Sequence, residues 1–155
     1  YHASMIREEA LRVGIEPAAL LALVAQESQF EWWARSRVGA QGLTQLMPET
    51  AYETCPDLFP RGRHLLQTRK NARCGARYLA IQLRTFRGFR CALYAYNAGP
   101  GSAMRSGCSA PYEDARIYAD KVLRYYWLYR FAEQAMSNCD GLEESAFEAC
   151  SHRRR

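Results

Sequence analysis

Apolar side chains recur at helical spacing along most of this 155-residue chain, and no segment shows the apolar–polar alternation typical of a half-buried strand. The clearest segment is 68–87, which ends before Gly88. One face of that segment carries small and apolar side chains: Ala72, Gly75, Ala76, Leu79, Leu83 and Phe86. The small side chains predict close packing against another helix. The pattern as a whole predicts a mainly α protein.

The other predicted helices have recognisable ends. A first helix over 4–13 stops at Gly14, and a second over 18–29 follows Pro17, a residue tolerated in the first helical turn. Segment 32–45 is predicted to turn because it contains two glycines. The remaining predictions are a short helix from Pro48, a helix over 89–97, a turn at Gly99-Pro100-Gly101, a helix over 113–130 with Tyr118, Val122, Tyr125 and Tyr129 on one side, and a last helix over 140–150.

Glu27 occupies an unusual position in this pattern. Leu20, Leu23 and Val24 form an apolar stripe on the second predicted helix, and Glu27 continues that stripe toward the core. Burial disfavours the ionised form of a carboxyl group and raises its pKa. A glutamate that stays protonated near neutral pH is suited to act as a general acid. The alternative is a partly exposed glutamate at a frayed helix end.

Length and composition are those of one ordinary globular domain. Hydrophobic residues make up 48% of the chain and charged residues 24%, and no stretch approaches the ~20 apolar residues of a membrane-spanning helix. The chain opens with Tyr1 and lacks a basic-then-apolar leader, so we expect that any export signal has been removed. Residues 1–135 are predicted as the domain, and 136–155 as a C-terminal extension with a basic end.

Six cysteines are many for a chain of this length. None forms a C-x-x-C pair and only three histidines are present, so the spacing of a zinc site is missing. An even, scattered set favours disulfides and an oxidising compartment over reduced core thiols. Cys139 and Cys150 are a plausible local pair that would tether the extension.

The net charge of +5 comes from 21 basic and 16 acidic residues, and Arg153, Arg154 and Arg155 supply three of the positive charges. Without these arginines the chain is only mildly basic. The composition therefore argues against a nucleic-acid-binding surface.

Polar side chains gather at helix ends and turns in segments 36–45 and 93–101, where they can converge on a cleft. Gln45 and Asn97 offer donors and acceptors suited to amides and hydroxyls. Tyr94 and Tyr96 are candidates for a sugar-binding wall, although a core position is at least as plausible for Tyr94.

These segments resemble, in order, the motifs of the lytic transglycosylases with a soluble-type catalytic domain, which are related to goose-type lysozyme. The resemblance covers about 16–126 and rests on AQESQF, SRVGAQGLTQLMPETA, NARCGARYL, ALYAYNAGPG and ARIYADKVLRYY. It implies a lysozyme-like, mostly helical domain of the bacterial periplasm or cell envelope. The implied reaction is cleavage of the β-1,4 bond between N-acetylmuramic acid and N-acetylglucosamine in peptidoglycan.

The resemblance also implies roles for particular residues. Glu27 matches the single catalytic acid, and Ser36 matches a serine that polarises the substrate near the reacting sugar. The other matched residues line the cleft, hold an acetamido sugar or, for the last, point a hydroxyl toward the acid: Gln45, Met47, Tyr96, Asn97 and Tyr118.

Three departures from the family pattern concern sugar contacts rather than the acid. Thr44 stands where the family usually has Met, Trp32-Trp33 where it has Asn-Pro, and Glu113-Asp114 where Glu-Thr is common. Trp32 and Trp33 are candidates for stacking on sugar faces, but packing is the commoner role of tryptophan.

Glu31 is the other carboxylate near Glu27 in the sequence; we expect it to be solvated, and its family counterpart has no catalytic role. The resemblance implies that Glu27 acts first as acid and then as base, that the substrate's 2-acetamido group stabilises C1, and that a 1,6-anhydromuramoyl end forms without a metal or cofactor.

A muramidase that delivers water to C1 and a non-catalytic peptidoglycan-binding module are the alternatives. The expected partners are glycan strands and an envelope-spanning secretion, conjugation or phage apparatus, with the chain acting as a monomer.

Overall fold

The computed structural model describes residues 2–109 and 113–137. This part of the chain is mainly α, as predicted, and contains no strand; its two isolated antiparallel bridges join Arg35 to Gln41 and Gln41 to Leu46. None of its helices is both long enough and apolar enough to cross a membrane.

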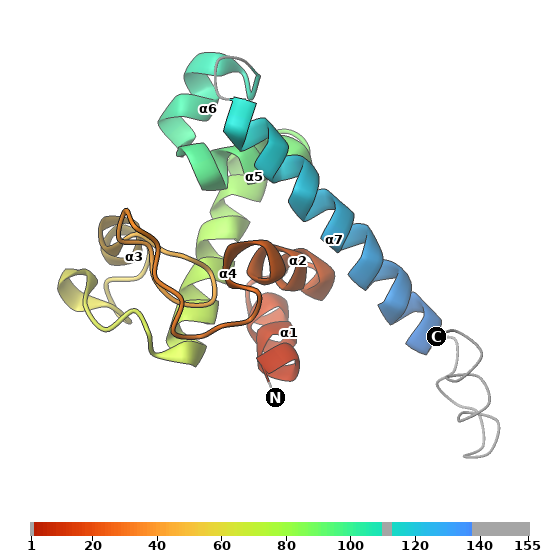
Figure 1. Cartoon of the computed structure of the whole chain (residues 1–155), viewed down its shortest axis with the longest axis horizontal. Coiled ribbons are helices and arrows are strands. Elements are labelled where there is room, and N and C mark those ends of the chain that lie inside the picture. The colour runs from red at the N-terminus through yellow and green to blue at the C-terminus, as the bar shows by residue number, and fades with distance from the viewer. Residues whose placement is uncertain (1, 110–112, 138–155) are drawn as a thin grey trace.

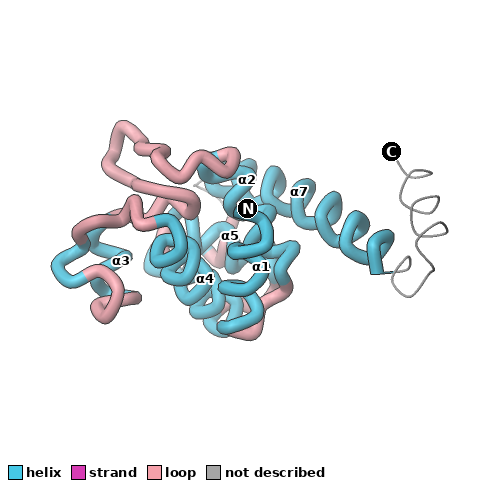
Figure 2. The backbone as a smooth tube through the Cα atoms, turned by 90° about the horizontal axis from the view of Figure 1, so that it is seen from below, coloured by secondary structure: helices cyan, strands magenta, loops and turns pink. Residues whose placement is uncertain are grey.

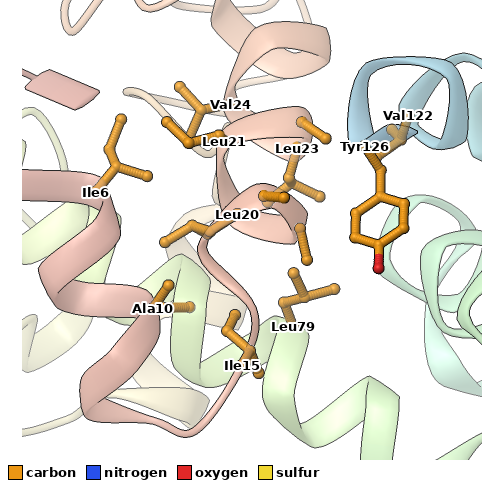
Figure 3. Close-up of a cluster of buried hydrophobic side chains, with 14 of the residues drawn as sticks. Ile6, Ala10, Ile15, Leu20, Leu21, Leu23, Val24, Leu79, Val122 and Tyr126 are labelled. Carbon is orange, nitrogen blue, oxygen red and sulfur yellow. The ribbon is translucent and has the colours of Figure 1, made fainter. Parts of the chain in front are cut away.

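The helices form a compact body from which α7 runs out along one side (Figure 1). In chain order the described elements are α1 (His2–Arg12), α2 (Pro17–Ser28), α3 (Pro48–Thr54), the 3₁₀ helix η1 (Pro60–Gly62), α4 (Thr68–Thr85), α5 (Phe89–Ala98), α6 (Pro100–Ser106) and α7 (Glu113–Ser137). The core joins side chains of α1, α2, α4, α5 and α7, including Ile6, Leu20, Leu79 and Val122 (Figure 3).

Helix α2 is the central helix of this core. The predicted apolar stripe of Leu20, Leu23 and Val24 is buried, but it is only part of the buried surface, because every side chain from Ala18 to Ala25 is buried. Four of these eight residues are alanines, which let α1 and α7 approach closely. Exposure returns only at the C-terminal end, where the helix stops at Ser28 because Gln29 adopts a left-handed conformation with φ 52°.

Several predicted boundaries need correction. Pro100 starts α6 where a simple turn was predicted, because proline fits the first position of a helix. Helix α7 continues to Ser137, beyond the predicted end near Arg130. The predicted helix over 140–150 and the extension over 136–155 fall wholly or mostly outside the described residues, so they stay predictions.

Two disulfides confirm the expectation of paired cysteines. Cys55, after α3, is bonded to Cys74 in α4, and Cys91 in α5 is bonded to Cys108, which follows α6. The predicted Cys139–Cys150 pair lies outside the described residues.

A buried carboxylate fixes α4 against α1. Glu9 has no exposed surface, and its oxygens accept hydrogen bonds from Arg73 and Arg69 at 2.8–3.2 Å. Burial alone would raise the pKa of Glu9, but these two arginines and Arg12 outweigh it and hold the pKa below its ordinary value. The pairing sets the position of the helix that supports the long loop.

Figure 2 shows the long loop between α2 and α3 in pink. Side chains from three helices hold this loop at two consecutive residues. Ser28 of α2 donates a hydrogen bond to the Leu43 carbonyl at 2.8 Å, and Tyr96 of α5 donates to the Thr44 carbonyl at 3.0 Å. Asn71 of α4 accepts the Thr44 N–H at 2.9 Å. In a β-sheet, hydrogen bonds between strands would satisfy these backbone groups; here the three side chains do so instead.

Asn71 is hydrogen-bonded at every polar position of its amide. Its Oδ1 accepts the Thr44 N–H and hydroxyl, and its Nδ2 donates to the carbonyls of Gln41 and Leu65, both at 2.9 Å. A Cβ at Gly42 would come within 2.4 Å of Asn71 Nδ2, so the contact requires glycine there.

Gly75 lets the same loop lie directly on α4. A Cβ at this position would meet the Thr44 side chain at 2.4–2.5 Å. The close packing predicted for the small residues of α4 is therefore made partly with a loop, and not only with another helix.

Asn71→Ala tests this arrangement. It should lower the free energy of unfolding by about 2–4 kcal/mol, because it leaves buried donors and acceptors of the loop without partners. Urea unfolding measures this loss, with the adjacent exposed Lys70→Ala as control. Equal stability of the two variants would contradict the role given to Asn71.

Candidate active site

A cleft of about 430 Å³ lies where the C-terminal ends of α2 and α5 meet the long loop. Side chains from α2, the loop, α3, α4 and α5 line it: Glu27, Ser36, Val38, Ala40, Gln45, Leu46, Met47, Thr50, Tyr78, Tyr96 and Asn97. Ala98 and Gly99 complete its wall. Six of the seven residues predicted from the sequence are in this set, and the seventh, Tyr118, contacts the first of them.

Glu27 lies on the last turn of α2, where the helix leaves the core. It keeps partial exposure toward the cleft, and its carboxyl group is enclosed by the surrounding side chains. Burial raises the pKa of Glu27 to about 7, and the hydrogen bond from Tyr118 offsets part of that rise. The carboxyl group therefore exchanges its proton near neutral pH.

Tyr118 reaches Glu27 from the inner side of α7. Its hydroxyl donates to Glu27 Oε1 at 2.5 Å, the lower end of the range for an O–H···O bond to a carboxylate. Burial, together with the charge of Glu27, holds the pKa of Tyr118 well above its ordinary value, so the phenol stays protonated and remains a donor. The pair joins α2, which carries the acid, to α7.

Glu27 is the one carboxylate among the described cleft-lining residues. Glu31 is exposed and does not share a helical face with Glu27, because α2 ends at Ser28. The solvated position predicted for Glu31 is confirmed. Within the described ranges, no group of three His, Cys, Asp or Glu side chains is placed to hold a metal ion.

Gln45 has a fixed orientation in the cleft. Its Nε2 donates both hydrogens to backbone carbonyls, of Ala34 at 3.1 Å and of Gly42 at 2.9 Å. Carbonyls only accept, so the NH₂ group must face them and Oε1 is left for a ligand. The backbone of Gln45 is in the left-handed region with φ 45°, a strained conformation that the clamped loop maintains.

Ser36 is positioned by a local turn. Its N–H donates to the Ala40 carbonyl at 2.9 Å, and its Oγ accepts the Ala40 N–H at 3.0 Å. The hydroxyl hydrogen can therefore donate into the cleft.

The predicted residues of α5 have different positions. Asn97 is exposed at the end of the helix, whereas the ring of Tyr96 is buried and its hydroxyl is used by the Thr44 carbonyl. Tyr96 thus contributes its ring to the cleft lining, and its hydroxyl supports the loop. Met47 is exposed at the other side of the cleft. Tyr94 lies in the core, where its hydroxyl donates to the Ser109 carbonyl at 3.0 Å.

Trp32 and Trp33 lie outside the cleft lining. Both are exposed and pack edge to face on each other, with ring centroids 5.6 Å apart. Their stacking on sugar stays a prediction.

Sequence reasoning missed Tyr78, Thr50 and Val38 as cleft residues. The ring of Tyr78 lies 4.9 Å from that of Tyr96, and the two form the apolar wall. Tyr78 and Asn71 both belong to the NARCGARYL motif. This motif was therefore the sequence signal for the cleft residue Tyr78 and for Asn71, which supports the loop.

Comparisons with known proteins agree with this geometry. The transglycosylase SLT domain family matches residues 4–118. The soluble lytic murein transglycosylase of Salmonella typhimurium is 36% identical over 135 residues, which cover 75% of this chain and 21% of that protein. The membrane-bound lytic murein transglycosylase C of Edwardsiella ictaluri is 33% identical over 117 residues, or 65% of this chain and 32% of that protein.

Solved structures give the same result. An inactive mutant of the lytic transglycosylase Slt from Pseudomonas aeruginosa matches with a TM-score of 0.78 and 33% identity over 87% of this chain and 25% of that one. The 70 kDa soluble lytic transglycosylase of Escherichia coli matches with a TM-score of 0.73 and 31% identity over 84% of this chain and 24% of that one. The chain thus spans between a fifth and a third of the relatives' length. Its fold is lysozyme-like and mainly α, and the chain belongs to the transglycosylase SLT domain family.

Proposed function

We propose that this chain is a peptidoglycan lytic transglycosylase that cleaves the β-1,4 bond between N-acetylmuramic acid and N-acetylglucosamine. The observation that carries the proposal is the state of Glu27: a carboxyl group with its pKa raised to about 7, in a cleft whose described lining holds no second carboxylate. The relatives named as lytic murein transglycosylases support the same reaction.

In the first step, protonated Glu27 donates its proton to the glycosidic oxygen as the C1–O bond breaks. The 2-acetamido carbonyl of the substrate stabilises C1 from the opposite side, which removes the need for a carboxylate nucleophile. Tyr118 holds one oxygen of Glu27, so the other oxygen can face the leaving group.

In the second step, the Glu27 carboxylate accepts the proton of the muramoyl 6-hydroxyl as that oxygen attacks C1. The product is a 1,6-anhydromuramoyl end, and no water is consumed. A pKa near 7 suits both steps, because the proton is gained and lost at similar cost.

The cleft offers complementary groups to acetamido sugars. Gln45 Oε1 can accept an amide N–H, the Ser36 hydroxyl can donate, and the exposed Asn97 amide can do both. The rings of Tyr78 and Tyr96 supply an apolar wall for a sugar face.

The proposed setting is the periplasm or cell envelope, with the chain acting as a monomer on glycan strands. Two disulfides favour an oxidising compartment. The compact domain suits local opening of the wall during assembly of a secretion, conjugation or phage apparatus.

Glu27→Gln should reduce release of muropeptides from purified sacculi by at least about a thousandfold, because glutamine cannot transfer the proton. The matched control is Glu31→Gln, which removes an exposed carboxylate four residues away and should retain activity. Loss of activity in both variants, or in neither, would contradict the assignment of Glu27. Binding to sacculi without release by the wild-type chain would instead indicate a non-catalytic module.

The products should be one water lighter than those of a muramidase. Mass spectrometry of wild-type digests resolves this difference directly. Products that carry the full water mass would assign the chain as a hydrolase that uses the same acid.

Glu27 should also affect stability in a pH-dependent way. Its folded-state pKa, about 7, lies above the ordinary value of 4.5, so folding stability is lost as pH rises between these values. Glu27→Gln should therefore unfold like the wild type at pH 4 and be more stable by about 2–3 kcal/mol at pH 8. Thermal or urea unfolding at the two pH values measures this, and a constant difference would show that the carboxyl group is not perturbed by folding.

A further inference from the structure

The outer side of α7 exposes three large apolar side chains. Trp127, Leu128 and Phe131 are 49%, 61% and 64% exposed, and the first and last place their ring centroids 6.0 Å apart. Val122 and Tyr126, which face the core, lie on the opposite side of the helix. We call this exposed trio the α7 patch; the helix that carries it runs along one side of the body (Figure 1).

Positive charge surrounds the α7 patch. Lys121, Arg124 and Arg130 are exposed on the same helix, and the Arg130 guanidinium lies 5.6 Å from the Trp127 ring. The acidic residues along α7 that form ion pairs bind other arginines: Glu113 with Arg116, Asp120 with Arg90, and Glu133 with Arg7. Arg130 lies near Glu16, since both are hydrogen-bonded to the Tyr126 hydroxyl. Among the described residues no acidic side chain forms an ion pair with Lys121 or Arg124, so these two cations remain beside the patch.

A hollow of about 520 Å³ adjoins the patch between α2 and α7. Its lining includes the polar side chains of Gln26, Gln29, Lys121, Arg124 and Tyr125, and Leu128 belongs to both the hollow and the patch. Amide, ammonium and guanidinium groups all donate hydrogen bonds to phosphate oxygens.

The size of the patch argues against a second copy of the chain as its partner. Three such side chains at about half exposure offer roughly 300 Å² of apolar surface, whereas a stable protein interface buries about 800 Å² from each partner, of which more than half is apolar. A convex helix side with Trp, Leu and Phe between Lys and Arg is instead suited to the interfacial region of a bilayer, where rings and stems contact acyl chains and cations contact phosphates.

We propose that the outer side of α7 binds the surface of an anionic phospholipid bilayer. Trp127, Leu128 and Phe131 enter the interfacial region, and Lys121 and Arg124 contact headgroup phosphates at the hollow. Tyr118 points to Glu27 from the inner side of the same helix, so the cleft stays accessible while α7 is bound. This surface does not depend on the reaction proposed for the cleft.

Sedimentation with vesicles tests the proposal. The wild-type chain should bind vesicles that contain phosphatidylglycerol and should bind pure phosphatidylcholine vesicles at least tenfold more weakly. Leu128→Glu should weaken binding to the anionic vesicles at least tenfold. Leu11→Glu is the matched control, since Leu11 is 65% exposed on α1 and the charge change is the same.

Further readouts separate the alternatives. Arg124→Gln should weaken binding severalfold and reduce its salt dependence, and excess inorganic phosphate should not displace the chain from vesicles. Equal binding by the two leucine variants, or no binding by the wild type, would overturn the proposal. So would a concentration-dependent dimer, seen by light scattering, that Leu128→Glu abolishes. Muropeptide release by Leu128→Glu at the wild-type rate would show that its cleft is intact.

Discussion

The site depends on the hydrogen bonding of two consecutive residues, Leu43 and Thr44. Three of their backbone groups are held by side chains from three different helices: Ser28 of α2, Asn71 of α4 and Tyr96 of α5. A loop without a sheet partner would otherwise leave these buried groups unsatisfied, at a cost of about 1–3 kcal/mol each. The same bonds set the distance between the cleft wall and the acid.

The position of the acid follows from how α2 ends. The helix is buried on all sides until Ala25 and stops three residues later, so Glu27 lies on the last turn between core and cleft. There it loses enough hydration to raise its pKa, while the Tyr118 hydroxyl limits the rise. The resulting carboxyl group costs stability at neutral pH and is suited to proton transfer, as is common for functional groups.

Two of the departures from the family pattern lie outside the cleft lining. Thr44, in place of the usual methionine, packs on Gly75 and donates its hydroxyl to Asn71 at 2.8 Å. The side chain therefore strengthens the loop attachment and makes no contact in the cleft lining. Trp32 and Trp33 are likewise not part of the cleft lining and lie in the exposed segment after α2.

Local patterns were sufficient for most of the helices, because periodicity and end signals such as Pro17 and Gly88 act over a few residues. They failed at Pro100, where the same residue opens a turn or a helix, and at the end of α7, where no breaker marks the boundary.

The sequence by itself determined the helical class, the ordered motifs and the identity of the residues that meet at the cleft. The spacing of apolar residues placed Glu27 near the core, but this argument was incomplete. Such spacing cannot distinguish a half-buried helix from one that is buried on all sides. Only the tertiary structure decided which groups of Gln45 are free, that the Tyr96 hydroxyl is occupied, and that Asn71 supports the loop. Those outcomes depend on hydrogen bonds between residues up to 52 positions apart, which no local pattern records.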